Sequence, residues 1–373
     1  MKHFVSFSIV SVLLACVFSC KPAEIEHALP ADVATGTLSL TVAEKSGPLT
    51  KADPTAYIVA QNYERRINSI EILVFYRGGV QDGFLAYSEK LTNSSATFTM
   101  TRQYDLPVGD YTVCAYVNGA ADLTTAQKAS LAAFHAVAVA LTDNSVSESA
   151  GFVMSGESNA SVAASGTNTC EVSLQRVLNR VVINKISNNL ASGTLTVKRI
   201  WLANIVTGQN LSVDVSGNDR VWAHQFSRAA SPWTGSTLIS SFTASTLTSK
   251  APNAVIANGG NVNDPANYLL YAFANLKSAT AAEDALVYLP VATVWSPTKT
   301  RVVIEASVNG VDYYYPYDLT LGSRNQTNTL DFVISGLGLD DPQGDPGELA
   351  REALSVTISV AEWVPYECKE IFY

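Results

Sequence analysis

The sequence predicts an all-β protein of two domains, and three observations lead to this prediction. Charged residues make up only 15% of the 373 residues. Apolar and polar residues alternate in many short segments, and turns rich in Gly or Pro separate these segments. Val, Thr and aromatic residues are abundant, which favours strands over helices. Many short strands with such turns are typical of antiparallel β-sandwiches.

The composition also excludes some classes of function. The formal net charge is −9, from 24 Lys and Arg against 33 Asp and Glu. This balance argues against a basic nucleic-acid-binding face. The chain contains 13 Phe, 16 Tyr and 5 Trp, which supply enough core material to argue against intrinsic disorder.

The N-terminus has the pattern of a signal peptide, predicted for residues 1–19. Lys2 is followed by an apolar stretch that is shorter than the roughly 20 residues of a membrane span. The stretch ends in a sequence typical of bacterial lipoprotein signals, with Cys20 preferred as the lipidated residue. Cys16 and an ordinary secretory signal remain as alternatives. A lipid on Cys20 would anchor the precursor without spanning the bilayer.

The first expected strand is Gly36–Lys45, where Leu38, Leu40 and Val42 alternate with hydroxyl residues. A segment rich in Pro and Gly follows and contains Lys51. Such a segment is expected to be an exposed loop that a protease can bind.

The remaining elements follow the same logic. One short helix is expected at Thr125–Ala133, and the Ser- and Gly-rich segment Ser155–Thr169 is expected to separate two blocks of strands. Ser227–Asn267 is expected to be loop with short pieces of structure. Further strands are expected at Ile67–Tyr76, Ala96–Thr101, Tyr111–Val117, Glu171–Ile186, Gly193–Ile205, Tyr268–Asn275, Leu286–Val294, Arg301–Val308, Asp312–Tyr317, Asn325–Leu337 and Ala353–Val364.

The sequence contains no recognisable catalytic or metal-binding motif, so we expect neither an enzyme nor a cofactor. His135 and His224 are the two histidines within the expected folded core, and no hydrolase or phosphate-binding pattern accompanies them. The acidic residues after Asp340 lack the spacing of a calcium loop and fit a solvated linker. The three cysteines Cys114, Cys170 and Cys368 are odd in number and too widely spaced for a disulfide framework. We expect buried thiols, and a bridge between any two of them in an oxidising compartment is the alternative.

Several stretches, taken in order, form a recognisable series: Ile67–Tyr76, Leu106–Asn118, Gly151–Glu157, Leu174–Val177, Tyr271–Asn275, Arg324–Gly338 and Val360–Val364. This series resembles the major fimbrial subunit family of Bacteroidales (the fimbrillins or type V pilins). Each stretch is weak alone, but together with the lipoprotein signal they extend over nearly the whole chain.

The resemblance implies two transthyretin-like, Greek-key β-sandwiches in tandem and assembly by donor-strand exchange. An Arg- or Lys-specific surface protease would cleave between Lys51 and Ala52, remove the strand with Leu38, Leu40 and Val42, and open a groove. The expected segments are a signal peptide at 1–19, a lipidated propeptide at 20–51, sandwiches at 52–168 and 169–339, and a linker with a donor strand at 340–373.

The C-terminal strand Ala353–Val364 is the predicted donor. Its apolar residues alternate with Ser and Thr as in the first strand, and the preceding linker is rich in Pro and Gly. Burying four such side chains gives an upper estimate of about 6–12 kcal/mol per junction. The alternative is an ordinary last strand of its own sandwich. The predicted donor residues are Leu354, Val356, Ile358, Val360 and Trp363.

Arg65, Arg66 and Arg351 are alternative basic sites for a protease. Cleavage at Arg351 would remove the donor, whereas Arg65 and Arg66 directly precede a core strand and should be less accessible.

The resemblance therefore implies an adhesive shaft subunit of a surface fimbrium, with a precursor anchored in the outer membrane. Its partners would be further copies, accessory subunits, a processing protease and a host protein or glycan, but no nucleic acid. A tip or accessory adhesin is one alternative. The other is a monomeric glycan-binding lipoprotein that uses Tyr313–Tyr315 as a stacking platform.

Overall fold

The computed structural model describes residues 33–44, 61–92, 99–203, 205–212, 221–223, 245–265, 267–275, 300–340, 349 and 353–363. Several predictions lie outside these residues: the signal peptide, Cys16, Cys20, Lys51, Ala52, His224, the strand Leu286–Val294, residues 341–348 of the linker, Arg351 and Cys368.

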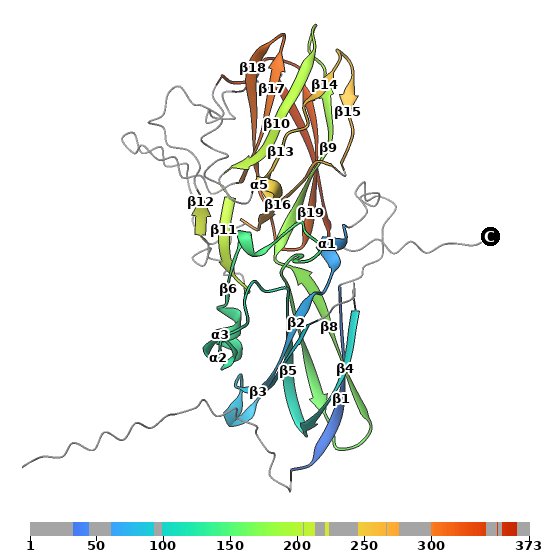
Figure 1. Ribbon diagram of the computed structural model, residues 1–373, viewed down its shortest axis with the longest axis vertical. Coiled ribbons are helices and arrows are strands. Elements are labelled where there is room, and N and C mark those ends of the chain that lie inside the picture. Colours follow the sequence, from blue (N-terminus) through green and yellow to red (C-terminus); the bar gives the residue numbers. More distant parts are fainter. Residues whose placement is uncertain are drawn as a thin grey trace, which may run out of the picture. The chain divides into compact units, whose positions relative to one another are not determined.

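The all-β prediction is confirmed, since strands form most of the described chain (Figure 1). Seven strands pair in the order β3-β2-β5-β7-β8-β1-β4. Their bounds are β1 Thr35–Glu44, β2 Ser69–Tyr76, β3 Leu85–Thr92, β4 Thr99–Pro107, β5 Gly109–Val117, β7 Met154–Val162 and β8 Thr167–Arg176.

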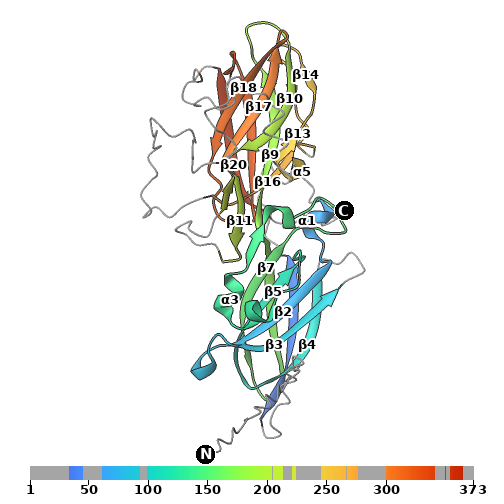
Figure 2. The same ribbon diagram turned by 60° about the vertical axis from the view of Figure 1, so that its left-hand side comes forward.

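The later strands form three further sheets, with orders β13-β10-β17-β18, β12-β11-β6 and β15-β9-β19-β20. Two strands pair off these paths, β14 with β10 and β16 with β9. In Figure 2, β10, β17 and β18 lie side by side. The bounds are β6 Ala138–Ala140, β9 Leu178–Asn188, β10 Leu195–Ala203, β11 Ile205–Asn210, β12 Val221–Ala223, β13 Ser249–Lys250, β14 Ala254–Ile256, β15 Asn261–Val262, β16 Leu269–Phe273, β17 Thr300–Val308, β18 Val311–Leu319, β19 Gln326–Ile334 and β20 Leu354–Glu362.

The helices are short: α1 Asn62–Arg65, α2 Thr125–Lys128, α3 Leu131–His135 and α5 Ser245–Thr248. The single helix expected at Thr125–Ala133 is wrong in its length, because two caps divide it. The hydroxyl of Thr124 accepts a hydrogen bond from the Gln127 amide, and that of Ser130 accepts one from Ala133. Within the described ranges, no helix is long and apolar enough to cross a membrane.

The segment Ser155–Thr169 is not the separating loop that its composition indicated. It forms most of β7 and the start of β8. Ala160 and Val162 are buried, whereas the alternate residues Glu157, Asn159 and Ser161 are exposed on the other face of the strand. The predicted strand Glu171–Ile186 is also divided, because β8 ends at Arg176 and β9 begins at Leu178.

This division bears on the predicted domain boundary. Residue 168 lies inside β8. β8 pairs with β1 and β7, whereas β9, which begins after Val177, pairs with β15, β16 and β19, and only the short β6 pairs across this point, with β11, among the described strands. One core cluster nevertheless joins residues of β2 and β5 with residues of β9, β16 and β19. The tandem arrangement therefore stays a prediction, and strand pairing favours Val177 over residue 168 as its boundary.

The sheets are mixed rather than purely antiparallel, which corrects the expected arrangement. Most pairs are antiparallel, but β1 runs parallel to β8 and β9 runs parallel to β19. Parallel neighbours need long connections, and here each pair is joined through several intervening strands.

Candidate functional site

The strand β1 lies between two neighbours, β8 and the edge strand β4, although it precedes every other described strand in the chain. It pairs antiparallel with β4 and parallel with β8, with Leu40 opposite Arg102 and Cys170 respectively (Figure 1). Residues 37–43 of β1 have a register partner on both sides. Removing this strand would therefore leave two unpaired backbone edges that face one another.

The apolar face of β1 is fully buried. Leu38 is 0% exposed, and Leu40 and Val42 are each 1% exposed. They pack in a core with residues of β2, β4, β5, β7 and β8, including Ile72 and Val113. The structure thus agrees with the alternation that predicted this strand, and its removal by a protease stays a prediction.

The C-terminal strand, β20, lies at the edge of its sheet, and among the described strands it pairs only with β19. Leu354 and Val356 are half-buried against the core. Ile358 is 37% exposed and Val360 is 54% exposed. The chain thus keeps this strand in its own sheet, as the alternative prediction has it, but buries it poorly.

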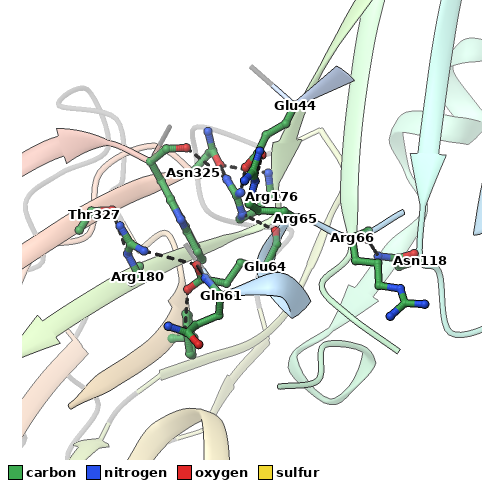
Figure 3. A network of polar contacts seen from close by, with 12 residues as sticks. Glu44, Gln61, Glu64, Arg65, Arg66, Asn118, Arg176, Arg180, Asn325 and Thr327 are labelled. Atoms are coloured by element: carbon green, nitrogen blue, oxygen red, sulfur yellow. Dashed lines mark hydrogen bonds and ion pairs between the residues drawn. The ribbon is translucent and has the colours of Figure 1, made fainter. Parts of the chain in front are cut away.

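A network of buried charges lies at the ends of these two strands (Figure 3). Glu44, the last residue of β1, forms an ion pair with Arg176 at the end of β8. Arg65 of α1 donates from Nε to the other carboxylate oxygen of Glu44 at 2.8 Å. The side chains of Glu44 and Arg176 are only 5% and 1% exposed.

Arg176 also contacts the end of β20. Its Nη1 donates to the Asn325 side-chain oxygen at 3.0 Å and to the Trp363 carbonyl oxygen at 3.1 Å. Its guanidinium carbon lies 4.3 Å from the centre of the Trp363 ring, a cation–π geometry. Burial lowers the pKa of the Arg176 guanidinium below its ordinary value, and the nearby charge of Arg180 adds to this.

A second buried pair joins Glu64 of α1 to Arg180 of β9. Arg180 Nη1 lies 3.4 Å from the Glu64 carboxylate, and the Tyr271 hydroxyl donates to that carboxylate at 2.8 Å. Burial raises the pKa of Glu64, and Arg180 and Tyr271 partly offset this effect. Arg180 lies 5.0 Å from the centre of the Trp363 ring, so Trp363 contacts both arginines.

The Arg176 guanidinium therefore contacts both Glu44, at the end of β1, and Trp363, the residue after β20. Sequence reasoning missed Glu44, Glu64, Arg176 and Arg180. The signal for Glu44 was present, because its position continues the face of Leu40 and Val42, where a carboxylate needs a buried cation. Nothing in the local pattern identified that cation.

Other predicted residues occupy structural positions. Cys114 and Cys170 are free and buried, as expected. His135, in α3, lies 2.8 Å from a carboxylate oxygen of Glu157. No group of three or more metal-ligating side chains occurs among the residues that the structure describes.

The tyrosine run Tyr313–Tyr315 does not form one platform. Tyr313 and Tyr315 pack on the main core, whereas Tyr314 packs on the opposite face beside Trp201. Of the alternative protease sites, Arg65 and Arg66 are half-buried and ion-paired with Glu44 and Glu148.

Residues 34–215 match a family model described as major fimbrial subunit protein (FimA). The matched region contains β1, its neighbours β4 and β8, and Arg176. The predicted resemblance to the major fimbrial subunit family is confirmed over these residues, and the description of the model is that of a structural fimbrial subunit. No curated protein sequence matches the chain.

Solved structures share the fold at low sequence identity. A candidate cell adhesion protein from Parabacteroides distasonis has a TM-score of 0.58 and 14% identity, over 89% of this chain and 98% of that one. A similar candidate from Bacteroides eggerthii has a TM-score of 0.57 and 15% identity, over 90% and 98%. A fimbrilin from Porphyromonas gingivalis has a TM-score of 0.54 and 15% identity, over 89% and 99%.

Proposed function

We propose that this protein is a structural subunit of a cell-surface fimbrium that polymerises by protease-triggered strand exchange. The precursor is exported as a lipoprotein anchored to the outer membrane through Cys20. A surface protease then cuts after Lys51 and releases β1. A strand from another copy fills the vacated position, and repetition builds an adhesive shaft.

The position of β1 is the observation that carries this proposal. A strand that is paired on both sides normally belongs to the permanent core, yet β1 precedes the predicted cleavage site and is otherwise held only by non-covalent contacts. Its loss would expose two sheet edges and an apolar core face. Such a gap is filled by strand addition, in which backbone hydrogen bonds give affinity and alternate side chains give specificity.

The monomeric glycan-binding alternative has weaker support. It relied on Tyr313–Tyr315 as a stacking platform, and these residues divide between two faces of β18 with Tyr315 completely buried. Core packing accounts for them.

The test is cleavage of the soluble precursor that lacks residues 1–20. The precursor is treated with a trypsin-like or gingipain-type protease, and the products are examined by N-terminal sequencing, electron microscopy and heat-resistant laddering on a gel. A new terminus at Ala52 with filaments supports a shaft subunit. Cleavage without polymers indicates a tip or accessory subunit, and resistance at Lys51 contradicts the mechanism.

A further inference from the structure

The strands β1 and β20 share more than their alternation. β1 ends in Val42-Ala43-Glu44 and β20 ends in Val360-Ala361-Glu362. Counting back from the two glutamates, apolar residues coincide at every second position and small polar residues lie between them. The coincident apolar pairs are Val42 with Val360, Leu40 with Ile358, and Leu38 with Val356.

The glutamates hold equivalent places on their strands. Side chains two residues apart share one face of a strand, so Glu44 continues the face of Val42 and Glu362 continues that of Val360. In β1 this carboxylate meets Arg176 and Arg65. In β20 Glu362 is exposed, on an edge strand, and its register partner is Gln326.

Loss of β1 would leave Arg176 without its anionic partner. Its other contacts are to carbonyl oxygens and to the Trp363 ring, and none of these carries a negative charge. A buried cation with no counter-charge is strongly unfavourable. The vacated position therefore favours a strand that brings a carboxylate to the end of β8.

We infer that Glu362 of a second copy replaces Glu44 beside Arg176 and so fixes the direction and register of the incoming strand. This inference rests on the proposed function, because it requires that the β20 segment of one copy enters the β1 position of another.

A register slip shows what the ion pair adds. A shift of two residues keeps every apolar side chain on the same face, so hydrophobic alternation alone cannot distinguish the two registers. The shift would, however, place Glu362 at the position of Val42, inside an apolar core, or move it beyond Arg176. Insertion in the opposite direction would take the carboxylate to the far end of the groove.

The same register limits the length of the inserted strand. Leu354 would fall at the position of Gly36, where a Cβ atom would collide with the carbonyl oxygen of Ala163. The inserted ladder therefore begins at Ser355, and Leu354 lies outside it unless the turn after β7 moves.

A labelled peptide of residues 355–364 tests the inference on the cleaved full chain. We expect the wild-type peptide to bind and E362Q to dissociate about tenfold faster or more, because truncating one partner of a buried ion pair acts mainly on the dissociation rate. The control T357Q, on the opposite face of the strand, should dissociate at the wild-type rate.

Register is read independently through Cys170, which lies opposite Leu40 in β8. Under mild oxidation with oxidised glutathione, the I358C peptide should form a disulfide with Cys170 in higher yield than the V356C or V360C peptides. Equal dissociation of wild-type and E362Q peptides, or preferential crosslinking of V356C or V360C, would overturn the inference while leaving strand exchange intact. Failure of the wild-type peptide to bind would contradict the proposed function itself.

Discussion

The strands β1 and β20 have nearly the same pattern but very different surroundings. β1 has neighbours on both sides, and its three apolar side chains are at most 1% exposed. β20 has one neighbour, and Ile358 and Val360 are 37% and 54% exposed. Alternation therefore predicts that a segment forms a strand. The position of the strand in its sheet decides how much its apolar side chains contribute to the free energy of unfolding.

The difference gives a driving force for exchange. Each fully buried aliphatic side chain contributes about 1.5–3 kcal/mol, and the partly exposed residues of β20 recover only part of this in their own sheet. Moving β20 into a vacated β1 position would bury Ile358 and Val360 more completely.

The largest effect is expected from removing the charge that anchors β1. In the uncleaved precursor, E44Q should lower the free energy of unfolding by about 3–5 kcal/mol, because it leaves Arg176 buried without its counter-charge. The matched variant E362Q should change it by about 0.5 kcal/mol or less, since Glu362 is exposed. Urea unfolding measures both, and equal effects would remove the distinction between the two strands.

The apolar side chains should show the same contrast. L40A removes a buried side chain from the core and should cost about 2–5 kcal/mol. I358A, at the coincident position of β20, should cost about 1 kcal/mol or less because its side chain is partly exposed. A cost for I358A as large as that for L40A would mean that β20 is as firmly held as β1.

Thiol reactivity should report the opening of the groove. Burial raises the pKa of both Cys114 and Cys170, so both thiols should react slowly with iodoacetamide in the precursor. Cleavage at Lys51 should expose Cys170, which neighbours β1, and leave Cys114 protected in the other core cluster. Mass spectrometry of a C368S variant measures the two sites. Unchanged protection of Cys170 after β1 has left would contradict the groove.

A smaller, pH-dependent effect is expected in the network beneath Trp363. Because burial raises the pKa of Glu64 above the ordinary 4.5, the native state binds this proton more tightly than the unfolded chain. The stabilisation by Glu64 should therefore fall as the pH rises through the interval between those two pKa values. The unfolding free energy of the wild type minus that of E64Q should decrease from about pH 4 to pH 7.

Glu157 provides a control of opposite sign. The hydrogen bond from His135 lowers the pKa of Glu157, so its contribution is present above the ordinary pKa and is lost as the pH falls. The difference between the wild type and E157Q should accordingly increase as the pH rises towards the ordinary 4.5 from below, and should change little above it. The same sign for both differences would contradict the assigned environment of Glu64.

The sequence predicted strands with a strong apolar signal. In β1 apolar and polar residues alternate, whereas β2 and β17 are apolar runs that are buried on both faces. The prediction failed at β7, where small polar residues cover one face and resemble a loop. It also failed to separate β8 from β9, because the apolar pattern continues through the break at Val177. Local alternation carries no information about which strand pairs with which, so the parallel pairing of β1 with β8 could not be predicted from it.

The candidate site, like the fold, could be predicted only where its sequence pattern is local. Leu38, Leu40 and Val42 could be identified because alternation is local. Arg176 could not, because its partners come from β1, from Asn325 before β19, and from Trp363 after β20. Contacts between residues so far apart in sequence depend on the topology.

Hydrogen exchange, compared between the precursor and its cleaved assembled form, tests the exchange of strands most directly. If β20 of one copy replaces β1 of another, the amides of β4 and β8 remain protected in the assembly, while β19 loses the partner that β20 provided and exchanges faster. If β19 keeps its protection and β4 and β8 lose theirs, the position of β1 stays empty and strand exchange does not occur.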